Sequence, residues 1–259
     1  MMGSIDESSV WVIDLDGVIW LGESPIEGAA DAVRTLQDAG RTVVFATNNS
    51  SLTRHGNEAK LARHSIDATD AVVSSAMAAG TLVEPGETVL VCGGDGVREA
   101  VSARGAIPRD EGPADVVVVG WTPEFDFDML TRAVQAIHGG ARLIGTNSDA
   151  TLPSATTLLP GCGSLVSAVA TAGGVDATFA GKPHQPLATY IHERYGTHGI
   201  VVGDRADTDG AFAATLGFEF ALVLSGVTGE ADLPVTPAPD HLAVDLGTLV
   251  HDLDTNKER

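Results

Sequence analysis

The sequence predicts an α/β protein with a doubly wound parallel-sheet core and a second α/β domain inserted into that core. Near both ends of the chain, short apolar, β-branched runs alternate with segments in which apolar residues recur at helical spacing. Strand–helix–strand connections of this kind join parallel strands and put helices on the faces of a sheet. The middle of the chain supplies a further set of strands and helices. With 259 residues, 44% of them hydrophobic, the chain is long enough to fill two cores.

The first predicted strand–helix–strand unit lies near the amino terminus. Ser24 and Glu27 form a capping-box pattern around Pro25, a residue favoured at the first helical position, so we expect a helix from Pro25 to Gly40. Strands are expected before and after this helix, and small polar residues after the second strand lead into another helix. The strands are expected at residues 10–13 and 41–46, the first helix at residues 25–40, and the second helix extends through residue 63. Two further strands are expected at residues 199–203 and 220–224.

Residues 80–180 hold the second set of elements. Strands are expected at residues 88–92, 115–120 and 142–146, and helices at residues 96–103, 127–138 and 164–172. The simplest account is a core domain made of residues 1–79 and 181–259, interrupted by an α/β domain of residues 80–180.

The composition argues against several classes of protein. A formal net charge of −20, with only three lysines, argues against nucleic acid or an anionic membrane surface as a partner. The two cysteines, Cys92 and Cys162, are too few for a disulfide framework and have no metal-ligand spacing. The amino terminus lacks the pattern of a signal peptide, and no apolar run is long enough to span a bilayer. We therefore expect a cytoplasmic protein.

Two carboxylates stand where the first strand ends. Asp14 and Asp16 are two residues apart, and strand residues with this spacing project to the same side. Two like charges this close are unfavourable unless they share a cation or a proton. The alternatives for Asp-x-Asp-Gly are a solvated turn and a calcium loop, but a buried strand comes before it and calcium-loop ligands do not follow. The pair therefore indicates a cation site.

Polar motifs follow other predicted strands in the same way, and the carboxyl ends of parallel strands share one crevice. The four motifs are Asp14-Leu15-Asp16, Thr47-Asn48-Asn49, Gly181-Lys182-Pro183, and Gly203-Asp204 with Asp209. In this order they make the chain resemble the haloacid dehalogenase superfamily phosphatases, of the NagD-like, nitrophenylphosphatase branch with a large α/β cap. The likeness covers nearly the whole chain, from Asp-Leu-Asp-Gly-Val-Ile-Trp at residues 14–20 to Gly-Asp-Arg-Ala-Asp-Thr-Asp at residues 203–209.

The resemblance implies a Rossmann-like core, a cap formed by residues 80–180, and Mg²⁺-dependent hydrolysis of small phosphomonoesters through an aspartyl-phosphate. Asp14 would be the nucleophile, and Asp16 would act first as general acid and then as general base. Mg²⁺ would offset the repulsion between a phosphate dianion and Asp14. Its implied ligands are the side chains of Asp14 and Asp204 and the main-chain carbonyl of Asp16. Asp209 would orient a metal-bound water, unless it is an exposed residue that caps the next helix.

The resemblance also implies that Thr47, Asn48, Asn49 and Lys182 bind the phosphoryl group. Thr47 offers a hydroxyl, and the turn after it offers main-chain N–H groups at the start of a helix. Lys182 offers a compact cation. The ordinary alternatives are a helix cap for the first three residues and an exposed lysine for the fourth.

Substrate choice is implied to lie in the cap loop of residues 146–153, with Asn147, Asp149 and Leu152 as candidate specificity residues. Vertebrate pyridoxal phosphatases of this branch carry a histidine where this chain has Leu152, which argues against pyridoxal phosphate as the substrate. Leu152 could contact an apolar leaving group or pack internally. The implied partner is a small phosphorylated metabolite, and the family also allows a homodimer through the cap.

Two alternatives to a phosphatase stay open. One is a metabolite-binding or regulatory protein that keeps the fold but is catalytically weak, although binding alone would not require Asp16. The other is a phosphotransferase or mutase. Phosphonatase chemistry would need a lysine from the cap, and residues 80–180 contain none.

Overall fold

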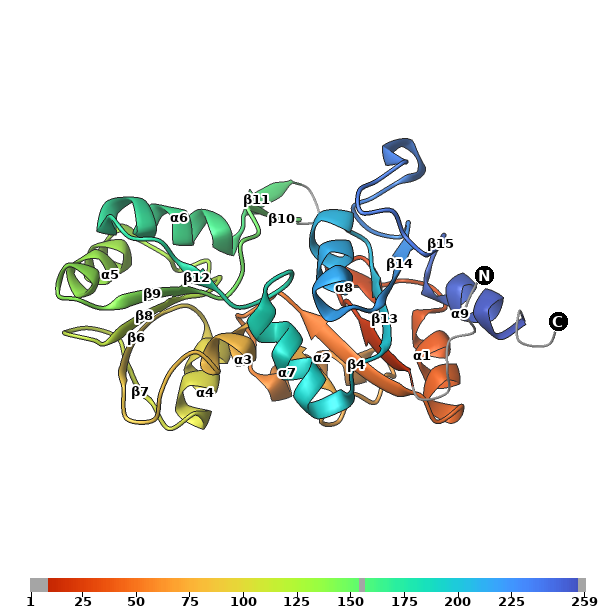
Figure 1. Ribbon diagram of the computed structural model, residues 1–259, viewed down its shortest axis with the longest axis horizontal. Coiled ribbons are helices and arrows are strands. Elements are labelled where there is room, and N and C mark those ends of the chain that lie inside the picture. The colour runs from red at the N-terminus through yellow and green to blue at the C-terminus, as the bar shows by residue number, and fades with distance from the viewer. Residues whose placement is uncertain (1–8, 154–156, 256–259) are drawn as a thin grey trace. The chain divides into compact units, whose positions relative to one another are not determined.

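A computed structural model describes residues 9–153 and 157–255, which fold as two compact α/β units (Figure 1). The first unit comprises residues 9–47, 58–73 and 188–255, and the second comprises residues 48–57, 74–153 and 157–187. The segments 48–57, 74–79 and 181–187 thus fold with the second unit, although they lie outside residues 80–180. The functional division into a core and a cap at residues 79 and 180 stays a prediction.

The first unit is built on a six-stranded sheet in the order β5-β4-β1-β13-β14-β15. The pairs β1–β4, β1–β13, β13–β14 and β14–β15 are parallel. Counted along the chain this order is 3-2-1-4-5-6, so the winding reverses between β1 and β13, where ligands of open α/β sheets bind. The strands are β1 (Val10–Ile13), β4 (Thr42–Thr47), β5 (Val72–Ser74), β13 (Gly199–Gly203), β14 (Glu219–Val223) and β15 (His241–Ala243).

Side chains of the central strand β1 show how this sheet is covered. All four residues of β1 are buried, as expected for a strand with both faces covered. Trp11 and Ile13 lie in one hydrophobic core with Val33 of helix α1 (Ala29–Asp38) and Leu249 of helix α9 (Leu246–Thr255). The other helical segments are α2 (Arg54–Arg63), α7 (Gln185–Tyr195), the π-helical turn η1 (Ala206–Gly210), α8 (Ala211–Leu216) and the 3₁₀ turn η2 (Glu230–Asp232).

The start predicted for helix α1 is wrong. Strand β3 (Ser24–Pro25) pairs antiparallel with β2 (Trp20–Leu21), and the helix begins only at Ala29. Gly22 has a φ of 61°, which lets a two-residue turn close this hairpin. The hairpin uses Ser24 and Pro25 as strand residues, so they are not available as a helix cap.

The second unit contains a five-stranded sheet in the order β7-β6-β8-β9-β12, and its neighbouring strands are parallel. Counted along the chain this order is 2-1-3-4-5, a second doubly wound arrangement. Its strands are β6 (Thr88–Cys92), β7 (Ile107–Arg109), β8 (Val116–Val119), β9 (Arg142–Gly145) and β12 (Thr178–Phe179). Its helices are α3 (Ser75–Gly80), α4 (Asp95–Ala103), α5 (Phe127–His138) and α6 (Cys162–Gly173), and β10 (Thr151–Pro153) pairs antiparallel with β11 (Leu158–Pro160).

Hydrogen bonds explain why residues 48–57 belong to the second unit. Ser50 Oγ accepts a hydrogen bond from the main-chain N–H of Trp121 at 3.0 Å, and Ser51 O accepts one from Gly96 N at 3.1 Å. These bonds attach the segment to residues that follow β8 and β6. The predicted α/β fold, with a doubly wound parallel sheet and a second α/β unit, is confirmed. Among the residues that the structure describes, no helix is both long enough and apolar enough to cross a bilayer.

Candidate active site

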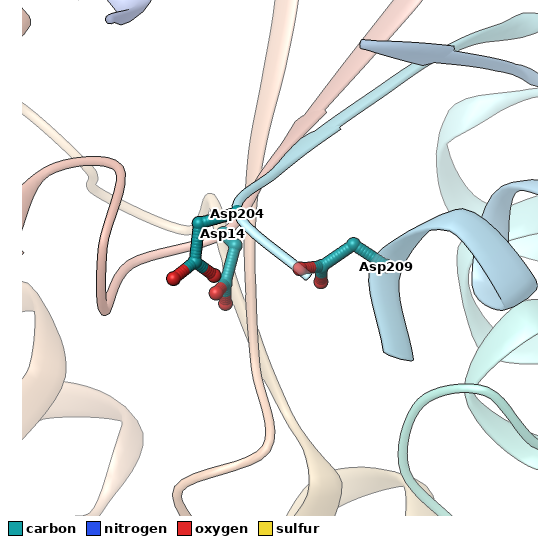
Figure 2. Close-up of side chains that lie close together, drawn as sticks. All are labelled: Asp14, Asp204 and Asp209. Carbon is teal, nitrogen blue, oxygen red and sulfur yellow. The ribbon is translucent and has the colours of Figure 1, made fainter. Parts of the chain in front are cut away.

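Three carboxylates meet at the point where the winding of the first sheet reverses. Asp14 follows β1, Asp204 follows β13, and Asp209 lies in η1. One oxygen of each lies within 4.8 Å of one oxygen of each of the others. Figure 2 shows Asp14 and Asp204 projecting side by side, with the carboxylate of Asp209 turned toward them. The predicted proximity of these three residues is therefore observed.

The sheet itself brings Asp14 and Asp204 together. β1 and β13 are parallel neighbours, and Ile13 is opposite Val202. Asp14 N then donates to Val202 O at 2.9 Å, which continues the ladder by one step past the strand. Residues that follow neighbouring parallel strands lie at the same edge of the sheet, so the motifs from the two ends of the chain join here.

The turn η1 directs Asp209 back toward the same edge. Asp209 N donates to Arg205 O at 2.8 Å, and Asp209 Oδ2 accepts from Arg205 N at 3.2 Å. The residue is only 1% exposed, so it is not the exposed helix cap that was the alternative for it. Asp207 in the same turn is exposed, and its hydrogen bonds with Arg205 lower the pKa of its carboxyl.

Asp204 occupies a space that two glycines leave open. An added Cβ at Gly17 or at Gly226 would lie 2.5 Å from Asp204 Cγ, closer than side-chain atoms approach one another. Gly17 also has a φ of 88°, a conformation that residues with a side chain rarely adopt. Asp204 Oδ2 accepts from Val227 N at 2.6 Å, which fixes the carboxylate in this space.

The donor set of this cluster fits a divalent metal ion. Asp204 is 2% exposed, so two of the three carboxylates are buried, and the repulsion between buried like charges this close is relieved by a cation or by a shared proton. Carboxylate oxygens are hard ligands, which suit Mg²⁺ or Ca²⁺ better than softer metals.

Two further predicted residues lie at this edge of the first unit. Asp16 follows Asp14 by two residues, is half-buried, and accepts a hydrogen bond on Oδ1 from Trp20 Nε1 at 2.9 Å. Thr47 is the last residue of β4, which pairs with β1, and it is 2% exposed. The first unit thus brings Asp14, Asp16, Thr47, Asp204 and Asp209 to the carboxyl ends of its central strands.

The other predicted residues form a hydrogen-bonded cluster in the second unit. Asn48 Oδ1 accepts from Lys182 N at 2.8 Å, and Asn48 Nδ2 donates to Lys182 O at 3.0 Å and to Asp149 Oδ2 at 2.9 Å. Asn147 Nδ2 donates to Asn48 O at 2.7 Å. Asn49 Oδ1 accepts from the main-chain N–H of Ser51 at 3.0 Å. Asn48 therefore connects Lys182, Asn147 and Asp149.

Leu152 is placed differently from these residues. It lies in β10 opposite Leu159 and is half-buried, so part of the predicted loop of residues 146–153 is a strand. Lys182 is 2% exposed, so it is not the exposed lysine that was its alternative.

Sequence reasoning missed two contacts at these sites. It did not assign Trp20 to Asp16, because a four-residue spacing within a turn does not give the direction of the two side chains. It also gave His184 no role, whereas His184 Nε2 is 3.1 Å from Ser148 Oγ and the imidazole stacks on Phe179. Burial lowers the pKa of His184, so its neutral form is favoured.

Comparisons with known proteins give a consistent result. A family model described as haloacid dehalogenase-like hydrolase matches residues 11–107, and a second model, described as HAD-hydrolase-like, matches residues 179–249. A 5′-nucleotidase of Bacillus subtilis is 34% identical over 255 residues, which cover 96% of this chain and 96% of that protein.

Two further proteins are similar over most of the chain. An acid sugar phosphatase of Staphylococcus saprophyticus is 31% identical over 252 residues, which cover 94% of this chain and 97% of that protein. The crystal structure of a glycerol phosphate phosphatase of Mycobacterium tuberculosis in complex with magnesium is similar with a TM-score of 0.88 and 34% identity, covering 98% of this chain and 80% of that one.

Proposed function

Because the chain belongs to the haloacid dehalogenase-like hydrolases, as its motifs predicted, we propose that it is a Mg²⁺-dependent phosphatase that hydrolyses small phosphomonoesters. The observation that carries this proposal is the cluster of Asp14, Asp204 and Asp209 oxygens at the sheet reversal, with Asp16 two residues from Asp14. The similar proteins are named for a nucleotidase, an acid sugar phosphatase and a glycerol phosphate phosphatase, which supports phosphate ester cleavage with varied leaving groups.

In the first half of the reaction, a carboxylate oxygen of Asp14 attacks phosphorus. The bond between phosphorus and the ester oxygen breaks, and its electron pair goes to the leaving oxygen. Asp16 gives its proton to that oxygen, so the product leaves as a neutral alcohol and the phosphoryl group remains on Asp14 as an acyl phosphate.

In the second half, water attacks the phosphorus of the acyl phosphate. Asp16, now ionised, takes a proton from this water, and the bond between phosphorus and Asp14 breaks. Inorganic phosphate leaves, Asp14 is again a carboxylate, and Asp16 is again protonated. One ester and one water thus give one alcohol and one phosphate.

We propose that the side chains of Asp14 and Asp204 and the main-chain carbonyl of Asp16 hold Mg²⁺, and that Asp209 orients a water of the ion. When bound, the ion supplies positive charge that offsets the repulsion between the phosphate dianion and Asp14. The burial of Asp204 and Asp209 supports this ligand set, because neither carboxylate has bulk water to solvate its charge.

We propose that the phosphoryl oxygens bind to the Thr47 hydroxyl, to main-chain N–H groups of Asn48 and Asn49, and to the Lys182 ammonium. The amide of Asn48 is already used in hydrogen bonds with Lys182 and Asp149, so its main chain is the better candidate for this role. Asn147, Asp149 and Leu152 stay candidates for contact with the leaving group, and a homodimer through residues 80–180 and a cytoplasmic location stay predictions.

Turnover of a panel of phosphomonoesters, measured as phosphate release with and without Mg²⁺, tests this function. We expect turnover only with the metal, and we expect Asp14→Asn to abolish it. Asp207→Asn is the matched control, because it removes an exposed carboxylate from the same turn as Asp209. Binding of phosphorylated compounds without phosphate release for any of them would instead support a metabolite-binding protein, and full activity of Asp14→Asn would refute the assignment of the nucleophile.

A further inference from the structure

Asp16 accepts a hydrogen bond from a buried side chain to which the proposed reaction assigns no role. Trp20 Nε1 donates to Asp16 Oδ1 at 2.9 Å, and the indole is 2% exposed. The two residues also form a main-chain bridge, and Gly17 N donates to Trp20 O at 2.7 Å. The side-chain contact therefore closes a short turn whose backbone is already held by hydrogen bonds.

The indole of Trp20 is held in place from several sides. Lys60 Nζ lies 4.1 Å from the centroid of the ring, and the centroid of the His64 ring is 5.6 Å away. Lys60 also donates to Gly22 O at 3.2 Å, in the hairpin that contains Trp20. Trp20 further belongs to the same hydrophobic core as Trp11. An indole packed this closely cannot reorient without disturbing the core.

We propose that Trp20 is a positioning residue that selects which oxygen of Asp16 exchanges the proton with the substrate. This inference rests on the proposed function. An oxygen that accepts a hydrogen bond from an indole N–H does not itself carry the acid proton at that position. With Oδ1 engaged by Trp20, Oδ2 carries the proton that goes to the leaving oxygen. The hydrogen bond also fixes the side-chain torsions of Asp16, so its carboxyl group is already oriented toward the leaving oxygen before the substrate binds.

The strength of this effect depends on the leaving group. An alkoxide is a poor leaving group and needs a proton as the ester bond breaks, whereas 4-nitrophenolate is a stable anion that leaves without one. The quantity to compare is kcat/KM, which covers the steps up to the departure of the alcohol or phenol. Removal of the indole donor should therefore slow alkyl phosphates selectively.

The test compares Trp20→Phe with wild type on two substrates, 4-nitrophenyl phosphate and the best alkyl phosphate from the panel. We expect kcat/KM to fall at least about tenfold for the alkyl ester and less than about threefold for the aryl ester, since general acid catalysis supplies about 10² to 10⁴. Trp11→Phe is the matched control, because Trp11 is 3% exposed in the same core and its Nε1 has no acceptor among the described residues. This control should leave the ratio of the two rates unchanged.

Two results would overturn the role proposed for Trp20. An equal loss on both substrates would mean that Trp20 has only a structural role, and an unchanged alkyl rate would mean that Asp16 needs no such donor; either overturns the inference. If Trp20→Phe does not fold, replacement of Trp20 by its benzothiophene isostere keeps the ring volume and removes only the N–H. Because both outcomes require a wild-type enzyme that turns over both esters, they are separate from a failure of the proposed function, which would appear as no turnover at all.

Discussion

Replacing Gly17 by alanine should weaken Mg²⁺ binding without unfolding the protein. The new Cβ would lie 2.5 Å from Asp204 Cγ and closer still to Asp204 Oδ2, so the carboxylate must move by about 1 Å or more to reach an ordinary contact of 3.4 Å. A displacement of this size can cost about 10²-fold in rate. We expect the Mg²⁺ concentration that gives half-maximal activity to rise by about 10- to 100-fold. The positive φ of Gly17 adds a cost in stability of about 1–2 kcal/mol.

Two further alanine variants separate displacement of Asp204 from backbone strain. Gly22 has a φ of 61°, and among the described residues nothing lies within 4 Å of an added Cβ, so Gly22→Ala should lower stability but leave Mg²⁺ activation unchanged. Gly226 has no positive φ, yet its added Cβ would lie 2.5 Å from the same Asp204 Cγ. Gly226→Ala should therefore weaken Mg²⁺ activation as Gly17→Ala does.

The assay is a Mg²⁺ titration of phosphate release, with the rise in Tm caused by saturating Mg²⁺ as a readout that does not depend on turnover. In wild type and Gly22→Ala, Mg²⁺ should raise Tm by similar amounts, and in Gly17→Ala the rise should shrink. If Gly17→Ala and Gly22→Ala need the same Mg²⁺ concentration for half-maximal activity, the reasoning is refuted, because the position of the Asp204 carboxylate would then not affect metal binding.

Three other predictions concern the second unit. Burial raises the pKa of Cys92 to about 12 and also raises the pKa of Cys162, so a thiol reagent should modify them only as the protein unfolds; fast modification of native protein would contradict their burial. Burial lowers the pKa of His184 in the folded protein below its usual value of about 6.5. As the pH falls below about 6.5, the unfolded chain therefore binds a proton that the folded protein does not, and the free energy of unfolding decreases until the pH reaches the folded pKa. Urea unfolding at several pH values should show this decrease in the free energy of unfolding, and His184→Gln should make the decrease smaller. An equal decrease in His184→Gln would show that His184 is not its source. Asn48→Ala should lower the free energy of unfolding by about 1–3 kcal/mol, because main-chain groups of Lys182 lose their partners; a loss below about 0.5 kcal/mol in urea would contradict this.

The sequence predicted those elements of the fold whose signal is local. Runs such as residues 88–92 and 199–203 are apolar and rich in valine, and they form β6 and β13 with the predicted bounds. The capping-box pattern at Ser24 failed because pairing with Leu21 in a hairpin competes with helix formation, and a four-residue pattern does not reveal that competition. Pairing of β1 with β13 joins residues from opposite ends of the chain, so no local pattern indicates it, and only a shared crevice at the strand ends was expected.

In the candidate site too, the sequence indicates features that follow from strand order but not those that depend on side-chain packing. The positions of Asp14 and Asp204 follow from their places after neighbouring parallel strands, which a sequence pattern can indicate. The contact of Trp20 with Asp16 depends on the direction of side chains in a turn, and spacing alone does not give that direction. Asn48 was expected to bind phosphate, and its side-chain amide bonds to Lys182 and Asp149 within the second unit, a set of contacts that no sequence pattern indicates.

The central claim is that Asp14 carries the phosphoryl group during turnover. The most direct measurement is to mix the Asp16→Asn variant with 4-nitrophenyl phosphate, whose leaving group departs without a proton, and Mg²⁺. The mixture is then quenched and reduced with borohydride, and the peptides are sequenced by mass spectrometry. An acyl phosphate on an aspartate is reduced to homoserine, and without the base the acyl phosphate should persist. We expect homoserine at position 14. Homoserine at another aspartate, or turnover with phosphate release and no reduced residue at position 14, would contradict it.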